Sequence, residues 1–357
     1  MKQIKHLLQV VATNNGFHLD SASFIKSSLE ANDVIVTDLF AKNTDDLEKR
    51  LLTYSLPDYS AVILHEPSNA SDRQYLYELL GKDVPMAGIV HDQCTGEEEA
   101  PDTRWLKIAS APAFRQHTEM WLPLYGGKVR RGRFPATETI VIASGSLQAD
   151  KYAAQLIDAL GALNVTNDVV HFGLQDEEEI AGGRGRLSEV VDRLCRAKLL
   201  VCTDDRLGSS ALAYYALHAD IPIIALESGG ISEILGCGGM ILRNCEPEET
   251  ALYVSVSAAD PVIRTKIRAG QRERLNAGYR ETVVGQKLLR MLGWQDSGDD
   301  FDISPPPVRS ATFVVEGPFD SSYSLAIVNR SLARALRHYQ IDVKIGARRY
   351  SPVPQLI

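Results

Sequence analysis

Residues 199–242, LLVCTDDRLGSSALAYYALHADIPIIALESGGISEILGCGGMIL, contain the pattern that decides the fold. An apolar run, a short loop with Gly208 and a helical pattern are followed by a turn with Pro222, a second apolar run and a Ser-Gly-Gly turn that opens a further helix. In a parallel sheet, two such junctions place helix N-termini at the carboxyl edge, where α/β proteins bind ligands. The N–H groups there suit a diphosphate, although the same glycines are also what plain turns require.

A similar alternation of short apolar runs and helical patterns extends to both sides and predicts two parallel α/β domains. A segment rich in glycine and basic residues, residues 126–135, interrupts the alternation and is interpreted as the joint. We expect a first domain at residues 1–132 and a second at residues 133–294. The expected strands are residues 6–12, 33–40, 61–65, 86–90, 139–143, 169–172, 199–202 and 221–226; the expected helices are residues 21–31, 44–54, 72–80, 151–163, 187–197, 209–219 and 258–292.

The chain changes character beyond the second domain. Residues 295–309 are acidic and then rich in proline, without apolar periodicity, which predicts a linker. A strand, a helix and a strand are predicted at residues 312–316, 325–339 and 343–345. One such unit cannot form a core of its own, so it either docks on the preceding domains or begins a further module at residues 310–357.

Composition and charge narrow the function classes. The chain has 357 residues, of which 45% are hydrophobic and 24% charged, and this ordinary globular composition excludes a disordered chain. The formal net charge of −8 argues against a broad electrostatic grip on nucleic acid or anionic lipid. Five cysteines without zinc-knuckle or redox-pair spacing, no signal-peptide pattern and no apolar run of transmembrane length predict a cytoplasmic protein without a metal centre.

The decisive stretch also has a family likeness. Gly208 opens the predicted helix, residues 216–220 (ALHAD) end it, residues 221–224 (IPII) supply the next strand, and residues 229–233 read GGISE. This order resembles the C-terminal domain of the retaining, nucleotide-sugar-dependent glycosyltransferases of the GT-B fold. In that family a Glu-Gly-Phe-Gly turn begins the helix, Glu-Ala-Met-Ala-x-Gly ends it, and a Pro-Val-Ile strand leads to Gly-Gly-x-x-Glu.

Segments outside that stretch extend the resemblance to about residues 58–292. Residues 58–65 (DYSAVILH) and 85–92 (PMAGIVHD) are similar to two strand motifs of the family's N-terminal domain. Residues 121–124 (WLPL) stand where the family has its inter-domain segment. Residues 246–279 look like the family's closing helices, which cross back toward the first domain.

The resemblance implies a GT-B-like fold, with two Rossmann-like domains facing a cleft, and a function. A sugar would move, with retention, from a UDP- or GDP-sugar to a glycan or lipid-linked acceptor, without a metal or other cofactor, because that fold uses helix dipoles and basic groups instead. The implied catalytic residue is His91, with His65 as an alternative strand-end histidine; either could equally be a structural residue. The implied donor-binding residues are Lys151, Gly208, Ser209, Ser210, Gly229, Gly230 and Glu233.

Three departures from the family keep a second function open. Leu207 and Tyr215 stand where the family has a pair of glutamates, and Ser146 stands where it has the arginine of its diphosphate clamp. A carboxylate cannot be replaced by Leu or Tyr as an ionic acceptor, although an aspartate of residues 204–205 could substitute for the first by a local shift. The alternative is a catalytically degenerate module that serves as scaffold or acceptor-binding partner of a following active module.

The expected partners follow from the same reasoning. Residues 312–333 look like the opening strand, loop and helix of another glycosyltransferase, which predicts a further module in the same chain. The other partners would be a nucleotide sugar and a glycan or lipid-linked acceptor, and no nucleic acid. The basic residues of the joint leave peripheral association with the inner face of the membrane open, although four charges in a hinge are usually solvated. These residues are Lys128, Arg130, Arg131 and Arg133.

Overall fold

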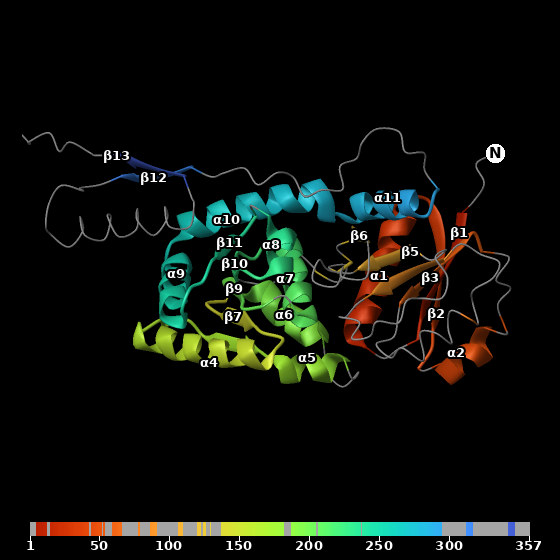
Figure 1. Ribbon diagram of the computed structural model, residues 1–357, viewed down its shortest axis with the longest axis horizontal. Helices are drawn as coiled ribbons and strands as arrows, with labels where there is room; N and C mark the ends of the chain where they lie inside the picture. Colours follow the sequence, from red (N-terminus) through yellow and green to blue (C-terminus); the bar gives the residue numbers. More distant parts are fainter. Residues whose placement is uncertain are drawn as a thin grey trace, which may run out of the picture. The chain divides into compact units, whose positions relative to one another are not determined.

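The computed structural model describes residues 5–294, with gaps at residues 13–14, 43, 52, 54–58, 66–77, 79–85, 91–105, 110–119, 123, 126–128, 130–136, 182–186, 205 and 237, and residues 312–316 and 342–346 beyond them. The chain divides into two compact units, Met1–Pro306 and Pro307–Ile357. The first unit contains two parallel sheets with helices packed on them (Figure 1), and the second contains one pair of strands. No helix in the described part is long and apolar enough to cross a membrane.

The first sheet and its helices form the first lobe. Its strands are parallel and lie in the order β2-β1-β3-β4-β5-β6. Strand β3 is buried at every position, as expected of a strand that is covered on both faces. The elements are β1 Lys5–Val11, α1 Gly16–Glu30, β2 Val34–Phe40, α2 Thr44–Leu51, β3 Ala61–His65, β4 Met86–Val90, β5 Leu106–Ala109 and β6 Met120–Trp121.

The second sheet and its helices form the second lobe. Its parallel strands lie in the order β11-β10-β9-β7-β8. Numbered along the chain within each lobe, both sheets contain the doubly wound order 2-1-3-4-5, in which the ligand crevice lies between the first and third strands. The elements are β7 Ile140–Ala143, α4 Leu147–Ala162, β8 Val169–Phe172, α5 Leu174–Ala181, α6 Leu187–Arg196, β9 Leu199–Cys202, α7 Leu207–Ala219, β10 Ile223–Leu226, α8 Gly229–Leu235 and β11 Met240–Leu242.

The predicted α/β fold of two Rossmann-like domains is confirmed, and the strands expected in both sheets are present. Helix α7 begins two residues earlier than predicted, and α1 and α4 begin four or five residues earlier because a polar residue caps each of these two N-termini. The Asn15 side chain accepts hydrogen bonds from Phe17 N and His18 N, and the Ser146 hydroxyl accepts one from Ala149 N. The helix predicted at residues 72–80 lies almost entirely outside the described residues.

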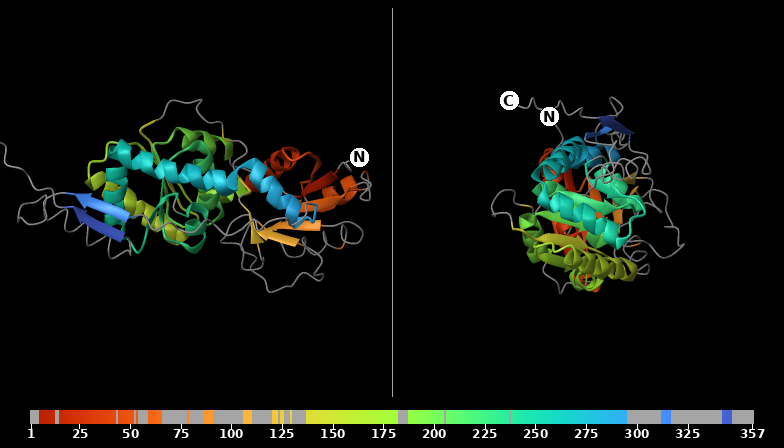
Figure 2. Two further views of the ribbon diagram at one scale, coloured as in Figure 1. Left: turned by 90° about the horizontal axis from the view of Figure 1, so that it is seen from above. Right: turned by 90° about the vertical axis from the view of Figure 1, so that its left-hand side faces the viewer.

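The helical tail predicted as one segment at residues 258–292 is instead a series of helices. α9 Pro247–Ala259, α10 Pro261–Arg274 and the π-helix η3 Leu275–Tyr279 precede α11 Glu281–Met291. Figure 2 shows the run of α10, η3 and α11 passing from the second sheet to the first. Val284 and Leu288 of α11 belong to the apolar core of the first lobe. The helix that packs on the first lobe is therefore α11. It lies just after residues 246–279, the segment for which the resemblance implied the crossing.

The second unit contains two described strands, β12 Thr312–Glu316 and β13 Asp342–Gly346, which pair in parallel. Both strands were predicted. The helix predicted between them at residues 325–339 lies outside the described residues.

Candidate functional site

The candidate site lies at the carboxyl edge of the second sheet. Strands β10, β9 and β7 are neighbours in that sheet, and each leads through a short loop into a helix, α8, α7 and α4 respectively. Because the strands are parallel, these three loops and helix N-termini lie at one edge. The structure thus brings to this edge the predicted donor-binding residues of the first turns of α7 and α8, which are Gly208, Ser209, Ser210, Gly229 and Gly230. Lys151 is the fifth residue of α4 and Glu233 the fifth of α8, so each lies one turn further along its helix. His91 lies outside the described residues.

The crevice position of this sheet, between β7 and β9, is closed by its own side chains. The Gly145 amide donates to Asp204 Oδ2 at 2.9 Å, and Thr203 Oγ1 donates to the Ala143 carbonyl at 2.9 Å. A Cβ at Gly145 would overlap the side chains of Arg206 and Glu177. Glycine is therefore required here for close packing, and the amide that a phosphate would use is bound to a carboxylate.

A second polar network fills the neighbouring position, between β7 and β8. The buried Ser144 hydroxyl hydrogen-bonds both Asp150 Oδ1 and, at 2.6 Å, His171 Nε2. Asp150 also accepts from the Leu174 amide at 3.3 Å. Since the carboxylate can only accept, Ser144 donates to Asp150 and His171 donates to Ser144. This network links α4, β7, β8 and α5, and its groups satisfy one another.

Spare hydrogen-bonding capacity is found at the α7 and α8 side of the edge. In the described part of the chain, neither N-cap residue, Arg206 for α7 or Ser228 for α8, caps its helix with a side-chain hydrogen bond. The hydroxyl groups of Ser228 and Ser232 are buried and have no hydrogen-bond partner among the described residues. Arg206 is the exposed N-cap residue of α7. Its positive charge therefore adds to the positive end of the α7 dipole. This part of the edge can accept an anion or a hydroxylated ligand.

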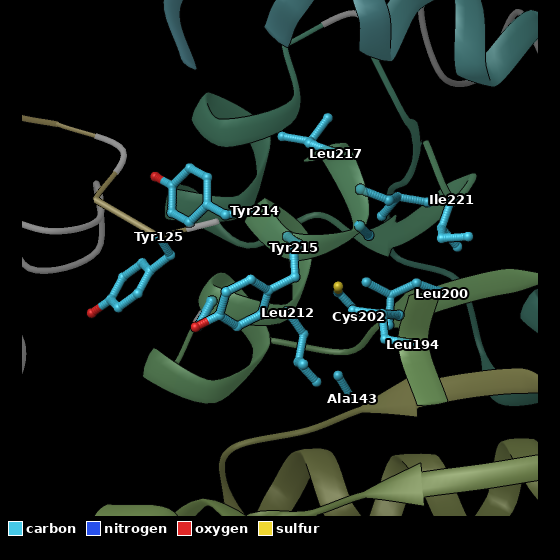
Figure 3. Packing of buried hydrophobic residues seen from close by; sticks show 14 of the residues in the cluster. Tyr125, Ala143, Leu194, Leu200, Cys202, Leu212, Tyr214, Tyr215, Leu217 and Ile221 are labelled. Atoms are coloured by element: carbon cyan, nitrogen blue, oxygen red, sulfur yellow. The ribbon is translucent and has the colours of Figure 1, made fainter. Parts of the chain in front are cut away.

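Tyr215, where the resemblance places one of the family's glutamates, is fully buried, and its hydroxyl contacts the first lobe. Its hydroxyl donates to Asp20 Oδ2 of α1 at 2.6 Å. Burial and the nearby Asp20 carboxylate raise the pKa of Tyr215 well above its usual value. Figure 3 shows Tyr215 next to Tyr125 and Tyr214 within the buried cluster. A carboxylate from the first lobe, that of Asp20, thus binds Tyr215, which stands where the resemblance places a glutamate.

We expect Tyr215→Phe to lower the free energy of unfolding by about 1–3 kcal/mol, because the buried Asp20 carboxylate loses a donor. Chemical denaturation of the variant and the native chain measures this difference. Asp20→Asn keeps an oxygen acceptor for Tyr215 and is expected to cost less than Asp20→Ala. An unchanged midpoint for Tyr215→Phe would show that this contact does not contribute to stability in solution.

Two buried histidines flank the corresponding crevice position of the first lobe. His65 ends β3, and His18 lies in the first turn of α1, which follows β1. Burial lowers the pKa of each to about 3, and for His65 the neighbouring His18 adds to the effect. Both are therefore neutral at neutral pH. Sequence reasoning named His65 but missed His18; the signal was Asn15, whose capping places His18 in the first helical turn.

Comparison with known proteins identifies the architecture. No protein-family model matches the chain, and no curated protein sequence matches it either. Among solved structures, the fold is similar to that of Anabaena Alr3699/HepE in complex with UDP-glucose, with TM-score 0.51, 11% identity, and coverage of 81% of this chain and 99% of that one. The fold is GT-B-like.

Two further structures support this GT-B-like assignment. A putative UDP-N-acetylglucosamine 2-epimerase from Listeria monocytogenes has TM-score 0.52 at 8% identity, with coverage of 84% of this chain and 100% of that one. A glycosyltransferase from Rickettsia africae has TM-score 0.50 at 12% identity, with coverage of 81% and 98%. At these identities the likeness concerns the fold.

Proposed function

We propose that this GT-B-like chain binds a nucleotide sugar at the α7 and α8 side of the second sheet and transfers the sugar to an acceptor. The observation that carries the proposal is made within the described residues: the helices after the adjacent strands β9 and β10 have no side-chain cap at their N-termini, and the buried hydroxyls of Ser228 and Ser232 have no hydrogen-bond partner there. Helix N-termini bind phosphate, and hydroxyl groups bind sugars. Two of the proteins with a similar fold are named for UDP-sugars, one as a UDP-glucose complex and one as a putative UDP-N-acetylglucosamine 2-epimerase, which supports this ligand class.

In the proposed chemistry, the role of each group follows from its charge or its hydrogen-bonding capacity. The α7 amides at Leu207, Gly208 and Ser209 would stabilise the leaving diphosphate, together with the charges of Arg206 and Lys151. The Ser210 amide donates to the Arg206 carbonyl within the helix, so this amide is not available to a phosphate. Ser210 would then only line the site. In this proposal the sugar lies at residues 229–233, as the resemblance implies, and Glu233 accepts hydrogen bonds from its hydroxyl groups. Retention, a UDP- or GDP-linked donor and a glycan or lipid-linked acceptor belong to this proposal.

A second candidate function is favoured by the closed crevice. The Gly145 amide already donates a hydrogen bond to Asp204, and the Tyr215 hydroxyl donates one to Asp20 of the other lobe. These contacts use internal groups where a donor-binding enzyme needs open ones. A degenerate module that acts as scaffold or acceptor-binding partner for a further module after residue 310 would have this arrangement. In either case the proposed location is the cytoplasm, with the inner face of the membrane as the place of a lipid-linked acceptor.

Titration calorimetry with UDP, GDP, UDP-glucose and GDP-mannose tests the proposal. We expect one nucleotide to bind, and Lys151→Ala to weaken it about tenfold, the effect of losing one charge-assisted phosphate contact. Lys266→Ala, which removes an exposed lysine of α10, is the matched control and is expected to leave binding unchanged. Absence of binding by every nucleotide would favour the scaffold. Binding that is insensitive to Lys151→Ala would place the diphosphate away from α4.

A further inference from the structure

The chain passes between the lobes twice. Each crossing carries a buried tyrosine, and the two tyrosines belong to the same cluster. The first crossing runs from β6 to β7 and carries Tyr125; the second runs from α10 to α11 and carries Tyr279 in η3. Tyr125 stacks on Tyr214 of α7, with ring centroids 5.9 Å apart, and Tyr214 meets the Tyr279 ring edge-on at 5.6 Å. Tyr125, Tyr214 and Tyr279, which we call the hinge cluster, are all buried. Figure 3 shows the Tyr125 and Tyr214 rings beside each other.

The hinge cluster is also bound to the end of α8. The Tyr279 hydroxyl donates to the Ile234 carbonyl at 2.7 Å, and Arg274 Nε donates to the same carbonyl at 3.0 Å. Arg274 further donates to the Glu233 carbonyl, and its guanidinium lies 5.0 Å from the centre of the Tyr279 ring. The last carbonyls of a helix lack partners within it, so these two side chains hold the C-terminal end of α8.

The connection at η3 joins parts that belong to different lobes. Upstream, Gln271 of α10 donates to the Ile221 carbonyl next to β10, which fixes α10 to the second lobe. Downstream, α11 packs on α1 of the first lobe, where Asn32 donates to both the Ser28 and Thr282 carbonyls. The π-helical turn η3 directly follows α10, and such turns occur frequently at functional sites. Of the two crossings, this one would have to bend if one lobe moved against the other, and it lies where Arg274 and Tyr279 contact the C-terminal end of α8.

We propose that Arg274 and Tyr279 are positioning residues that couple the hinge between the lobes to α8, and so set the place of Glu233 at the sugar end of the site. The role at the sugar end rests on the proposed function; the mechanical coupling does not. The Tyr214 hydroxyl is buried without a hydrogen-bond partner in the described part of the chain. An unsatisfied buried hydroxyl costs free energy, so any arrangement of the hinge cluster that gave the Tyr214 hydroxyl a partner would be favoured.

Tyr279→Phe tests the coupling, because it removes the bond to Ile234 and keeps the ring. Tyr152→Phe is the matched control: Tyr152 of α4 also donates to a backbone carbonyl, that of Cys245, at 2.8 Å, but lies outside the hinge cluster. In hydrogen exchange without ligand, we expect the amides of residues 231–235 to exchange about fivefold faster in Tyr279→Phe and to be unchanged in Tyr152→Phe. Equal exchange in the native chain and Tyr279→Phe would overturn the coupling.

A second measurement separates positioning from plain stability. We expect Tyr279→Phe to weaken UDP-glucose binding about fivefold while leaving UDP binding unchanged, because α8 is assigned to the sugar and α7 to the diphosphate. Equal weakening of both ligands would contradict positioning of the sugar end. If the native chain binds neither UDP nor UDP-glucose, the proposed function and the role of Glu233 fail, and the exchange measurement still decides whether the hinge is coupled to α8.

Discussion

Replacement of Gly285 by alanine is expected to lower the free energy of unfolding by about 3 kcal/mol, because it forces α11 away from α1. An added Cβ at Gly285 would overlap the Ser28 carbonyl oxygen and the Asn32 side chain. A backbone carbonyl cannot turn aside as a flexible side chain can, so the two helices must separate. Val284 and Leu288 of α11, which pack in the first lobe's core, would then lose contacts. Urea denaturation followed by circular dichroism measures the change.

The matched control is Gly161→Ala in α4. No atom lies within 4 Å of a Cβ placed at Gly161, so the added methyl group meets no obstacle. Because alanine is the better helix former, this variant is expected to gain about 0.5–1 kcal/mol. Opposite signs for the two Gly→Ala changes would support the close approach of α11 to α1. Equal signs would indicate that α11 does not pack there in solution.

The sheets were predictable because their strands are buried on both faces. Residues 61–65 and 86–90 form β3 and β4 with the predicted bounds, since a doubly covered strand is apolar along its whole length and polar residues or proline mark its ends. The helix starts depended on capping, and the signals were present: Asn15 and Ser146 each precede a helix that was predicted to begin later. The packing of a closing helix on the first lobe was expected only from the resemblance, which placed the crossing helices at residues 246–279, whereas the helix in the first lobe's core is α11.

The candidate site was predictable only as far as topology determines it. Parallel strands bring the loops after β7, β9 and β10 to one edge, so α4, α7 and α8 were expected to meet there, and they do. The contact between Asp20 and Tyr215 joins residues 195 positions apart, and no local pattern announces it. The bond between Gly145 and Asp204 likewise depends on how two loops pack. Sequence motifs therefore located the edge, and only tertiary packing revealed which part of it is closed.

Acidification is expected to destabilise the first lobe through His18 and His65. Burial lowers the pKa of both from 6.5 to about 3, so the folded state keeps them neutral where the unfolded chain binds protons. Stability is thus fully present above pH 6.5 and falls as the pH drops toward 3. At pH 4.5 each histidine accounts for a loss of up to about 2.7 kcal/mol, because each pH unit below the unfolded value costs about 1.36 kcal/mol. Two such groups can remove much of a typical domain's stability.

Urea midpoints at a series of pH values between 4.5 and 8 measure this dependence. His18→Gln is expected to halve the slope below pH 6.5, and the double variant with His65→Gln to remove most of it, since neither glutamine takes up a proton. Leu8→Ala, a truncation in the buried β1 strand of the same lobe, should lower stability by about 2–5 kcal/mol at every pH and leave the slope intact. A native chain whose midpoint stays constant down to pH 4.5 would mean that these two imidazoles are solvated in solution, and that the crevice position of the first lobe is open.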